Sequence, residues 1–267
     1  MVAGAVFAAC LAVGIAAASP AEDGQAAYDR GDFAKALAIW RPLAEQGEAD
    51  AEYGLGRLYS NGYGVAQDYG AALKWFRSAL QHGNVDANNG IGFLYVVGGG
   101  VPKDDARAAK LFRIAAEHGL ATAQFNLAWM YQKGSGVPRD YAVAFYWYKL
   151  AADQDLADAQ SNLADMYYKG IGIQADNAKA AELYRLAAEQ GLARAEQSLG
   201  AFYAYGLGVP VDYVQAHKWL SLSILHTAEE SRRNAIKTVR DRCAAKMTAE
   251  QIAEATRLAA TWRPRKP

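Results

Sequence analysis

The sequence predicts an all-α fold, an α-solenoid in which helix-turn-helix repeats are stacked. Three observations support this prediction. A Gly-x-Gly pair returns every 36 residues, an amphipathic helical pattern precedes each pair, and a second helical pattern follows it. A fixed period of this length is typical of stacked helical repeats. The pairs begin at Gly62, Gly98, Gly134, Gly170 and Gly206.

A glycine-rich loop that opens into a helix also occurs in nucleotide-binding proteins. Such a site uses one loop, which continues into Gly-Lys-Ser/Thr or completes Gly-x-Gly-x-x-Gly. Here the loop occurs five times and neither motif is completed. The glycines are therefore expected to end a helix and reverse the chain, because glycine readily adopts positive φ.

Composition excludes several classes of partner. The chain has 267 residues, of which 28 are basic and 28 acidic, and 52% are hydrophobic. This is the composition of a folded protein. A net charge of zero argues against nucleic acid or an anionic membrane as the main partner, since both select basic faces. Because repeat arrays grow by adding units, the length predicts one domain.

Residues 1–18 are predicted to be a signal peptide that is cleaved before Ser19. They carry no charged side chain and are rich in Ala and Val, although the usual basic start is missing. The chain is therefore expected in the bacterial cell envelope, periplasmic or secreted. The alternative is an uncleaved anchor, and membrane contact is expected only in that case. Cleavage would leave Cys243 without a disulfide partner, and its position beside Ile236 on a helical face predicts burial.

Residues 22–50 are predicted to form a degenerate first repeat, and five full repeats cover 51–227. In each full repeat the starting alanine, the Leu or Ile four residues later and the aromatic eight residues later share one helical face. The residues before these first helices are expected to be N-caps. The starting alanines are Ala51, Ala87, Ala123, Ala159 and Ala195, and the expected caps are Asp50, Asp86, Thr122 and Asp158.

The second helix of each repeat is expected to begin after an aspartate, whose carboxylate caps the helix rather than performing catalysis. A repeated alanine then allows close helix packing, and a large residue three positions later is expected to fill the adjoining space. The capping residues are Asp68, Asp104, Asp140, Asp176 and Asp212, and the large residues are Trp75, Leu111, Trp147, Leu183 and Trp219.

Residues 228–263 read as two amphipathic helices that cap the array. Thr248 and Gln251 have the spacing of a capping box. Ile236 and Trp262 are expected to cover apolar surface at the end of the last repeat, as a solenoid requires.

The pattern A-x-x-x-L-G-x-x-Y-x-x-G-x-G-V-x-x-D-x-x-x-A-x-x-W-[FY], followed by A-A-E-x-G, resembles the Sel-one-like repeat, a relative of the tetratricopeptide repeat. The resemblance implies a right-handed, tetratricopeptide-like superhelix that acts mainly as a protein-binding adaptor. Some secreted members carry cysteines that staple each helix pair, and this sequence lacks them.

In tetratricopeptide relatives the first helices line the concave groove. The positions two, six and nine residues after each starting alanine vary between repeats and are predicted to point away from the packed face. Aromatics there are expected to anchor a partner. The alternatives are internal packing and, for the charged members, ordinary solvated surface. The candidate partner-binding residues are Tyr53, Arg57, Phe93, Phe125, Trp129, Asp165 and Tyr168.

The chain is therefore predicted to be an exported adaptor or scaffold that binds a partner protein or peptide. No catalytic constellation, cofactor motif or metal-ligand spacing is found, so it is not expected to be an enzyme. His82 and His118 are interpreted as cations that complement helix dipoles. One alternative, suggested by secreted relatives, is an envelope enzyme acting on peptidoglycan fragments or binding β-lactams. Another is a carbohydrate-binding module, because Trp129 and Tyr168 could stack on sugar rings.

Overall fold

The structure is a computed structural model that describes residues 19–265. Within this range the chain forms fourteen α-helices and no β-strand. The predicted signal peptide lies outside the described residues. None of the helices in the described range combines the length and the apolar character needed to cross a membrane.

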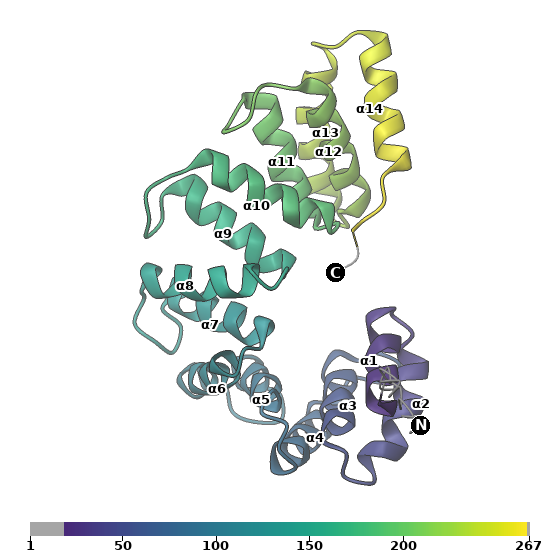
Figure 1. Cartoon of the computed structure of the whole chain (residues 1–267), viewed down its shortest axis with the longest axis vertical. Coiled ribbons are helices and arrows are strands. Elements are labelled where there is room, and N and C mark those ends of the chain that lie inside the picture. The colour runs from purple at the N-terminus through teal and green to yellow at the C-terminus, as the bar shows by residue number, and fades with distance from the viewer. Residues whose placement is uncertain (1–18, 266–267) are drawn as a thin grey trace, which may run out of the picture. The chain divides into compact units, whose positions relative to one another are not determined.

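The helices belong to two compact units, which divide at Asn84 and Val85. Within each unit, successive helices up to α13 pack against one another, and α14 packs on α12 (Figure 1). The predicted all-α class of stacked helix pairs is confirmed. The first unit holds α1 (Pro20–Asp29), α2 (Phe33–Ala44), α3 (Ala49–Asn61) and α4 (Tyr69–Gln81). The second holds α5 (Ala87–Val97), α6 (Asp105–Glu117), α7 (Ala121–Lys133), α8 (Tyr141–Ala152), α9 (Ala157–Lys169), α10 (Asn177–Glu189), α11 (Ala193–Tyr205), α12 (Tyr213–His226), α13 (Glu230–Ala244) and α14 (Ala249–Thr261).

The turn between the two helices of each repeat forms as predicted. The first helix ends at a left-handed glycine, with φ between 64° and 72° in the five repeats. The second helix begins after the predicted aspartate, whose carboxylate accepts a backbone N–H from the first turn in every repeat. These are local interactions, which explains why the sequence pattern alone identified them.

Replacing Asp140 with alanine tests this capping. Its carboxylate accepts hydrogen bonds from the backbone amides of Ala142 (2.9 Å) and Val143 (3.0 Å). We expect the free energy of unfolding to fall by about 1 kcal/mol in urea titrations, because two amides lose their acceptor. Asp140→Asn should keep most of the stability, since asparagine caps equally well. An alanine variant as stable as the wild type would contradict the assignment.

The predicted caps of the first helices are wrong. Asp50, Thr122 and Asp158 lie inside the first turn, and Asp86 precedes α5 without a capping side-chain hydrogen bond. Four of these helices begin two residues after a residue with positive φ, for example Gly119 at 100°. Because that residue already redirects the chain, the helix begins earlier than the apolar pattern suggested.

The large core residue of each second helix is one position later than predicted. Of the five predicted residues only Trp219 is buried, whereas the residue that follows is buried in every repeat. A residue four positions after the repeated alanine returns closer to its helical face than one three positions after it. The buried residues are Phe76, Phe112, Tyr148, Tyr184 and Leu220.

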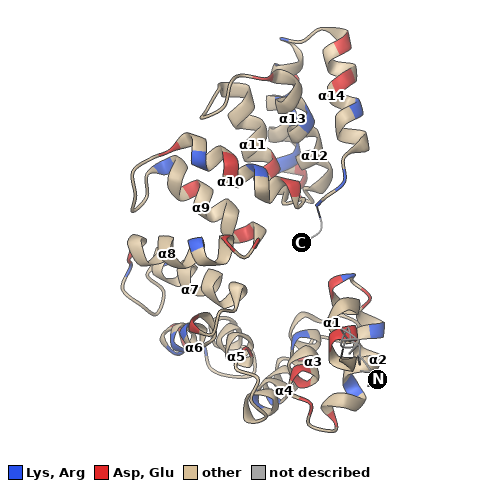
Figure 2. Ribbon diagram, viewed as in Figure 1, with Lys and Arg blue, Asp and Glu red and all other residues tan. Residues whose placement is uncertain are grey.

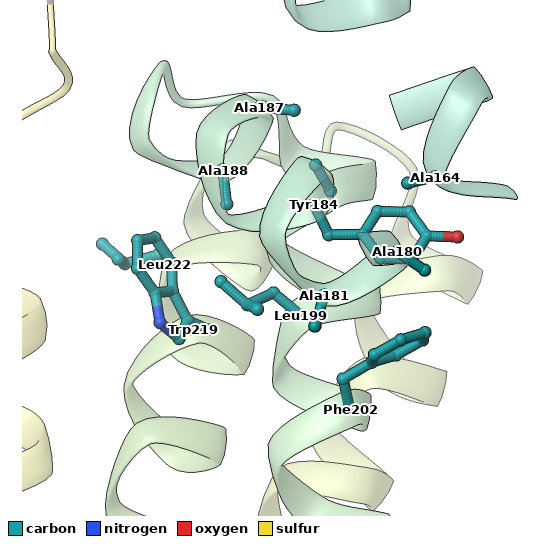
Figure 3. Packing of buried hydrophobic residues seen from close by; sticks show 11 residues of the cluster. Ala164, Ala180, Ala181, Tyr184, Ala187, Ala188, Leu199, Phe202, Trp219 and Leu222 are labelled. Atoms are coloured by element: carbon teal, nitrogen blue, oxygen red, sulfur yellow. The ribbon is translucent and has the colours of Figure 1, made fainter. Parts of the chain in front are cut away.

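The packing of Tyr184 illustrates the core between repeats. Its ring meets that of Phe202 from α11 at 5.1 Å between centroids and an interplanar angle of 74°. Figure 3 shows these rings with Leu199 and Trp219 in one apolar cluster. The small residue Ala164 of α9 belongs to the same cluster and leaves room for the large side chain.

The second glycine of the loop has a role that the sequence did not reveal. A Cβ atom built on Gly136 would lie 2.2 Å from the carbonyl oxygen of Asp105, at the start of the second helix of the preceding repeat. Gly172 and Gly208 make the equivalent approach to Tyr141 and Asn177. This glycine therefore serves two purposes, because it takes a positive φ and it admits a neighbouring backbone.

The C-terminal helices cover the last repeat. Ile236 and Cys243 of α13 are buried against Ala204 of α11 and Leu220 of α12. The Cys243 side chain is 3% exposed, and burial raises the pKa of its thiol. The predicted capping box at the start of α14 forms, and Trp262 packs edge-on against Trp219 at 6.1 Å between centroids.

Candidate partner-binding groove

A cavity of about 680 Å³ opens in the second unit on the side of the first helices. Most of its lining residues belong to α5, α7 and α9, and α6, α8 and α11 contribute one residue each. We call the first helix of each repeat its A helix, and we call this cavity the A-helix groove. Its principal lining residues are Phe93, Phe125, Asn126, Trp129, Asn162 and Asp165.

Two aromatic side chains of the groove are available to a ligand. Phe93 and Trp129 occupy the same position, six residues after the starting alanine, in consecutive repeats. Each is 38% exposed. Phe125 is less accessible, because its ring packs against Tyr148 at 5.7 Å between centroids. Phe93 and Trp129 are therefore the exposed aromatic side chains of the groove, while Phe125 forms part of its wall.

Tyr148 of α8 holds two polar side chains of the groove, Gln132 and Asn162, by hydrogen bonds. Its side chain is buried, its hydroxyl donates to Gln132 Oε1 at 3.0 Å, and it accepts from Asn162 Nδ2 at 2.9 Å. Burial raises the pKa of Tyr148 to about 12, so the hydroxyl stays protonated and keeps its donor role. The repeat pattern places an aromatic at this position in four of the five repeats, but it gives no sign that Tyr148 supports the groove.

Asp165 of α9 is the acidic residue among those that line the groove. It accepts a hydrogen bond from the Tyr184 hydroxyl, and its carboxylate is 3.8 Å from Lys169 Nζ. Burial, followed by the interaction with Asp165, raises the pKa of Tyr184. Asp165 therefore stands in the groove as a carboxylate that already has two partners.

The remaining candidates lie elsewhere. Tyr168 is 41% exposed, but it does not line the groove, and its ring packs edge-on against Phe202. Tyr53 and Arg57 belong to α3 of the first unit. The Tyr53 ring lies 5.8 Å from that of Phe76.

Arg57 is held by its neighbours. Its guanidinium carbon lies 3.9 Å from the centroid of the Tyr28 ring, and Nη1 donates to Gln25 at 2.8 Å. Of the seven candidate residues, four lie together in the groove of the second unit: Phe93, Phe125, Trp129 and Asp165. Their part in binding stays a prediction.

The prediction that positions two, six and nine point away from the packed face is wrong for three residues. Ser60, Ser161 and Ala204 occupy such positions and are buried. Ala204, for example, packs with Ile236 and Cys243 of α13, and the period of a single helix carries no information about such neighbours.

The structure also shows a row of buried polar side chains that the sequence analysis missed. Each follows the starting alanine of a first helix, and in four repeats it contacts the residue 30 positions later at the end of the second helix. Glu196 lies 2.9 Å from His226 Nδ1, and Gln160 accepts from Gln190 at 3.0 Å. The row comprises Glu52, Asn88, Gln124, Gln160 and Glu196.

Each residue type in this row changes together with that of its partner 30 positions later. This covariation between repeats is the sequence signal from which the pairs could have been found. Glutamate is paired with histidine in the first and fifth repeats, and glutamine with glutamine in the third and fourth. His82 thus has a specific partner, since its Nδ1 lies 2.8 Å from Glu52 Oε2. Across residues 19–265, no three His, Cys, Asp or Glu side chains are grouped so that they could hold a metal ion.

These features define a helical-repeat protein with a lateral groove. The chain belongs to the Sel1 repeat family, as the resemblance to the Sel-one-like repeat implied. The family model matches residues 49–84, 85–120, 121–156, 157–192 and 193–226. The start of each match lies at or within two residues of the start of a first helix.

Solved structures agree with this assignment. A Sel1 repeat protein from Oxalobacter formigenes is 26% identical, covers 91% of this chain and 100% of its own, and superposes with a TM-score of 0.71. A sel1 repeat protein from Klebsiella pneumoniae is 22% identical, covers 77% of this chain and 97% of its own, and shares the fold at a TM-score of 0.52. No curated protein sequence matches the chain.

Proposed function

We propose that this protein is an adaptor that binds a segment of a partner protein in the A-helix groove. The observation that carries the proposal is the pair of exposed aromatic rings, Phe93 and Trp129, on the wall of one cavity. Sel1 repeats generally mediate protein–protein interaction. Large aromatic side chains in a recessed site are typical energetic centres of such interfaces.

The groove suits a polypeptide in particular. Residues of four first helices line it, so an extended segment bound there can contact several repeats at once. Beside the aromatics it presents the amide side chains of Asn126, Gln132 and Asn162. Amides both donate and accept hydrogen bonds, as the backbone of a bound peptide requires.

The enzymatic and carbohydrate alternatives find less support. The carboxylate in the groove, Asp165, is engaged by Tyr184 and Lys169, and no Ser, Cys or His is among the described residues that line the groove. The carbohydrate alternative used Trp129 and Tyr168 together, yet Tyr168 does not line the groove.

Export remains part of the proposal because of the apolar pattern of residues 1–18. Mass spectrometry of the protein isolated from its native cells would detect cleavage before Ser19.

Affinity capture tests the proposal. The full chain is immobilised and exposed to an envelope extract of the native cells, beside a Phe93→Ala, Trp129→Ala variant. We expect the native chain to retain a protein that the variant loses. The retained protein is identified by mass spectrometry, purified and titrated, and we expect each substitution to weaken binding by at least about tenfold.

The matched control is a Tyr146→Ala, Leu225→Ala variant. These residues are 55% and 73% exposed and do not line the groove, so this variant should retain the partner. Circular dichroism confirms that all variants are folded. A partner retained equally by the Phe93→Ala, Trp129→Ala variant would contradict binding in the A-helix groove.

A further inference from the structure

A second cavity, of about 410 Å³, adjoins the A-helix groove. Residues of α9, α11 and α13 line it, and it shares Asp165 and Arg194 with the groove. A segment bound along the aromatic wall can therefore continue into it. Unlike the groove, the second cavity has no aromatic side chain, and its lining is mostly polar.

The charged side chains that line the two cavities are mainly cationic. Lys133, Lys169, Arg194 and Arg232 face a single acidic residue, Asp165. Acidic and basic residues are equal in number over the whole chain, and Figure 2 shows both on the helices around the cavities. The excess of cations is thus a local feature of these cavities.

Two of these cations lack an internal counterion. Within the described residues, Lys133 and Arg232 form no ion pair and no side-chain hydrogen bond, whereas Lys169 lies 3.8 Å from Asp165. An anion bound here would neutralise charge that the protein leaves uncompensated.

Arg194 is fixed at the junction of the two cavities. Its Nη2 donates to the backbone oxygen and to Oδ1 of Asp158, both at 2.9 Å. Because one nitrogen of the guanidinium is tied in this way, the group is oriented before a ligand arrives. A second arginine, Arg232, lines the same cavity, and guanidinium groups are the side chains best suited to bind carboxylate or phosphate oxygens.

We infer that the second cavity is an oxyanion subsite of the A-helix groove, so that the bound segment carries an acidic group beside the apolar residue held by Phe93 and Trp129. The inference rests on the proposed function and adds the chemical class of the partner. The oxyanion is the carboxylate of an acidic side chain or the phosphate of a phosphorylated one.

Selection from a random dodecapeptide library on the full chain tests the inference. We expect the selected peptides to combine an aromatic or aliphatic residue with a nearby Asp or Glu. One such peptide is then titrated by fluorescence anisotropy in three forms, with its acidic residue, with glutamine in its place, and with phosphoserine. The glutamine form should bind about tenfold more weakly, the loss typical of one charge-assisted hydrogen-bonded pair. Tighter binding of the phosphoserine form than of the acidic form would identify phosphate as the preferred source, and the reverse order would identify carboxylate.

Three variants make the test specific. An Arg194→Gln, Arg232→Gln variant should bind the acidic and glutamine peptides equally, while Arg77→Gln, Lys237→Gln, which changes cations outside both cavities, should keep the preference. Asp165→Asn should bind the acidic peptide more tightly, because it removes the carboxylate that lines both cavities and repels the ligand. Misfolding cannot produce that gain.

The outcomes separate the two proposals. If the native chain selects peptides that depend on Phe93 and Trp129 but show no acidic preference, the oxyanion subsite is wrong and the groove function stands. The same holds if the Arg194→Gln, Arg232→Gln variant keeps the acidic preference. If the native chain selects no peptide, both proposals are wrong.

Discussion

Replacing Gly136 with alanine is expected to lower the free energy of unfolding by at least about 3 kcal/mol, the sum of a strained backbone and an overpacked contact. Gly136 has φ of 69°, where a residue with a Cβ is disfavoured. The added Cβ would also lie 2.2 Å from the carbonyl oxygen of Asp105. That oxygen belongs to the first residue of α6, so it cannot move away without disturbing the start of that helix.

Gly119→Ala provides the matched control. Gly119 also has positive φ, at 100°, but no atom lies within 4 Å of the position of the added Cβ. Its cost is therefore the backbone strain alone, about 1–2 kcal/mol. Urea denaturation of both variants measures the difference, which reports the contact between consecutive repeats. Equal losses for the two variants would show that the loop does not press against α6.

Replacing His226 with alanine is expected to destabilise the protein by about 3 kcal/mol at pH 7, because it leaves a buried carboxylate unpaired. The Glu196 side chain is fully buried, and His226 is its hydrogen-bonding partner among the described residues. Burial raises the pKa of Glu196, while the hydrogen bond to His226 counteracts this shift. Without His226 only the burial effect remains.

The pH dependence of this defect has a definite sign. A carboxyl group with a raised pKa in the folded state favours folding when it is protonated, so the folded state loses stability as pH rises above the unfolded pKa. Adding Glu196→Gln to His226→Ala should therefore restore stability, and the gain should grow between pH 5 and pH 7. The third and fourth repeats already use glutamine at this position.

His118→Ala is the control for the loss of a histidine at the same place in a repeat. His118 is exposed, and its counterpart in the buried row is Asn88 rather than a glutamate. We expect a change within about 0.5 kcal/mol, as for an ordinary surface substitution. A gain from Glu196→Gln that is independent of pH would contradict the assignment of Glu196 as a buried carboxylate.

The helices that carry the groove could be identified from the sequence, but the full set of residues that line it could not. The repeat period identified the first helices and the positions six residues after the starting alanine, which place Phe93 and Trp129 in the groove. Tyr168, nine residues after its starting alanine, is exposed as predicted but lies outside the groove, and its ring packs on Phe202 of the next repeat. Which exposed side chains share one cavity depends on neighbours distant in sequence, and the period of one helix does not contain them.

The sequence by itself determined the helix pairs, the aspartate caps and the glycine turns. Each of these depends on interactions within a few residues or on the φ preference of a single residue, so the local pattern is sufficient. Only the tertiary structure decided that Tyr148 holds Gln132 and Asn162 and that Glu196 pairs with His226. It also brought Arg194 and Arg232 to one cavity. These arrangements bring together residues 14 to 38 positions apart, and they form only when helices pack side by side.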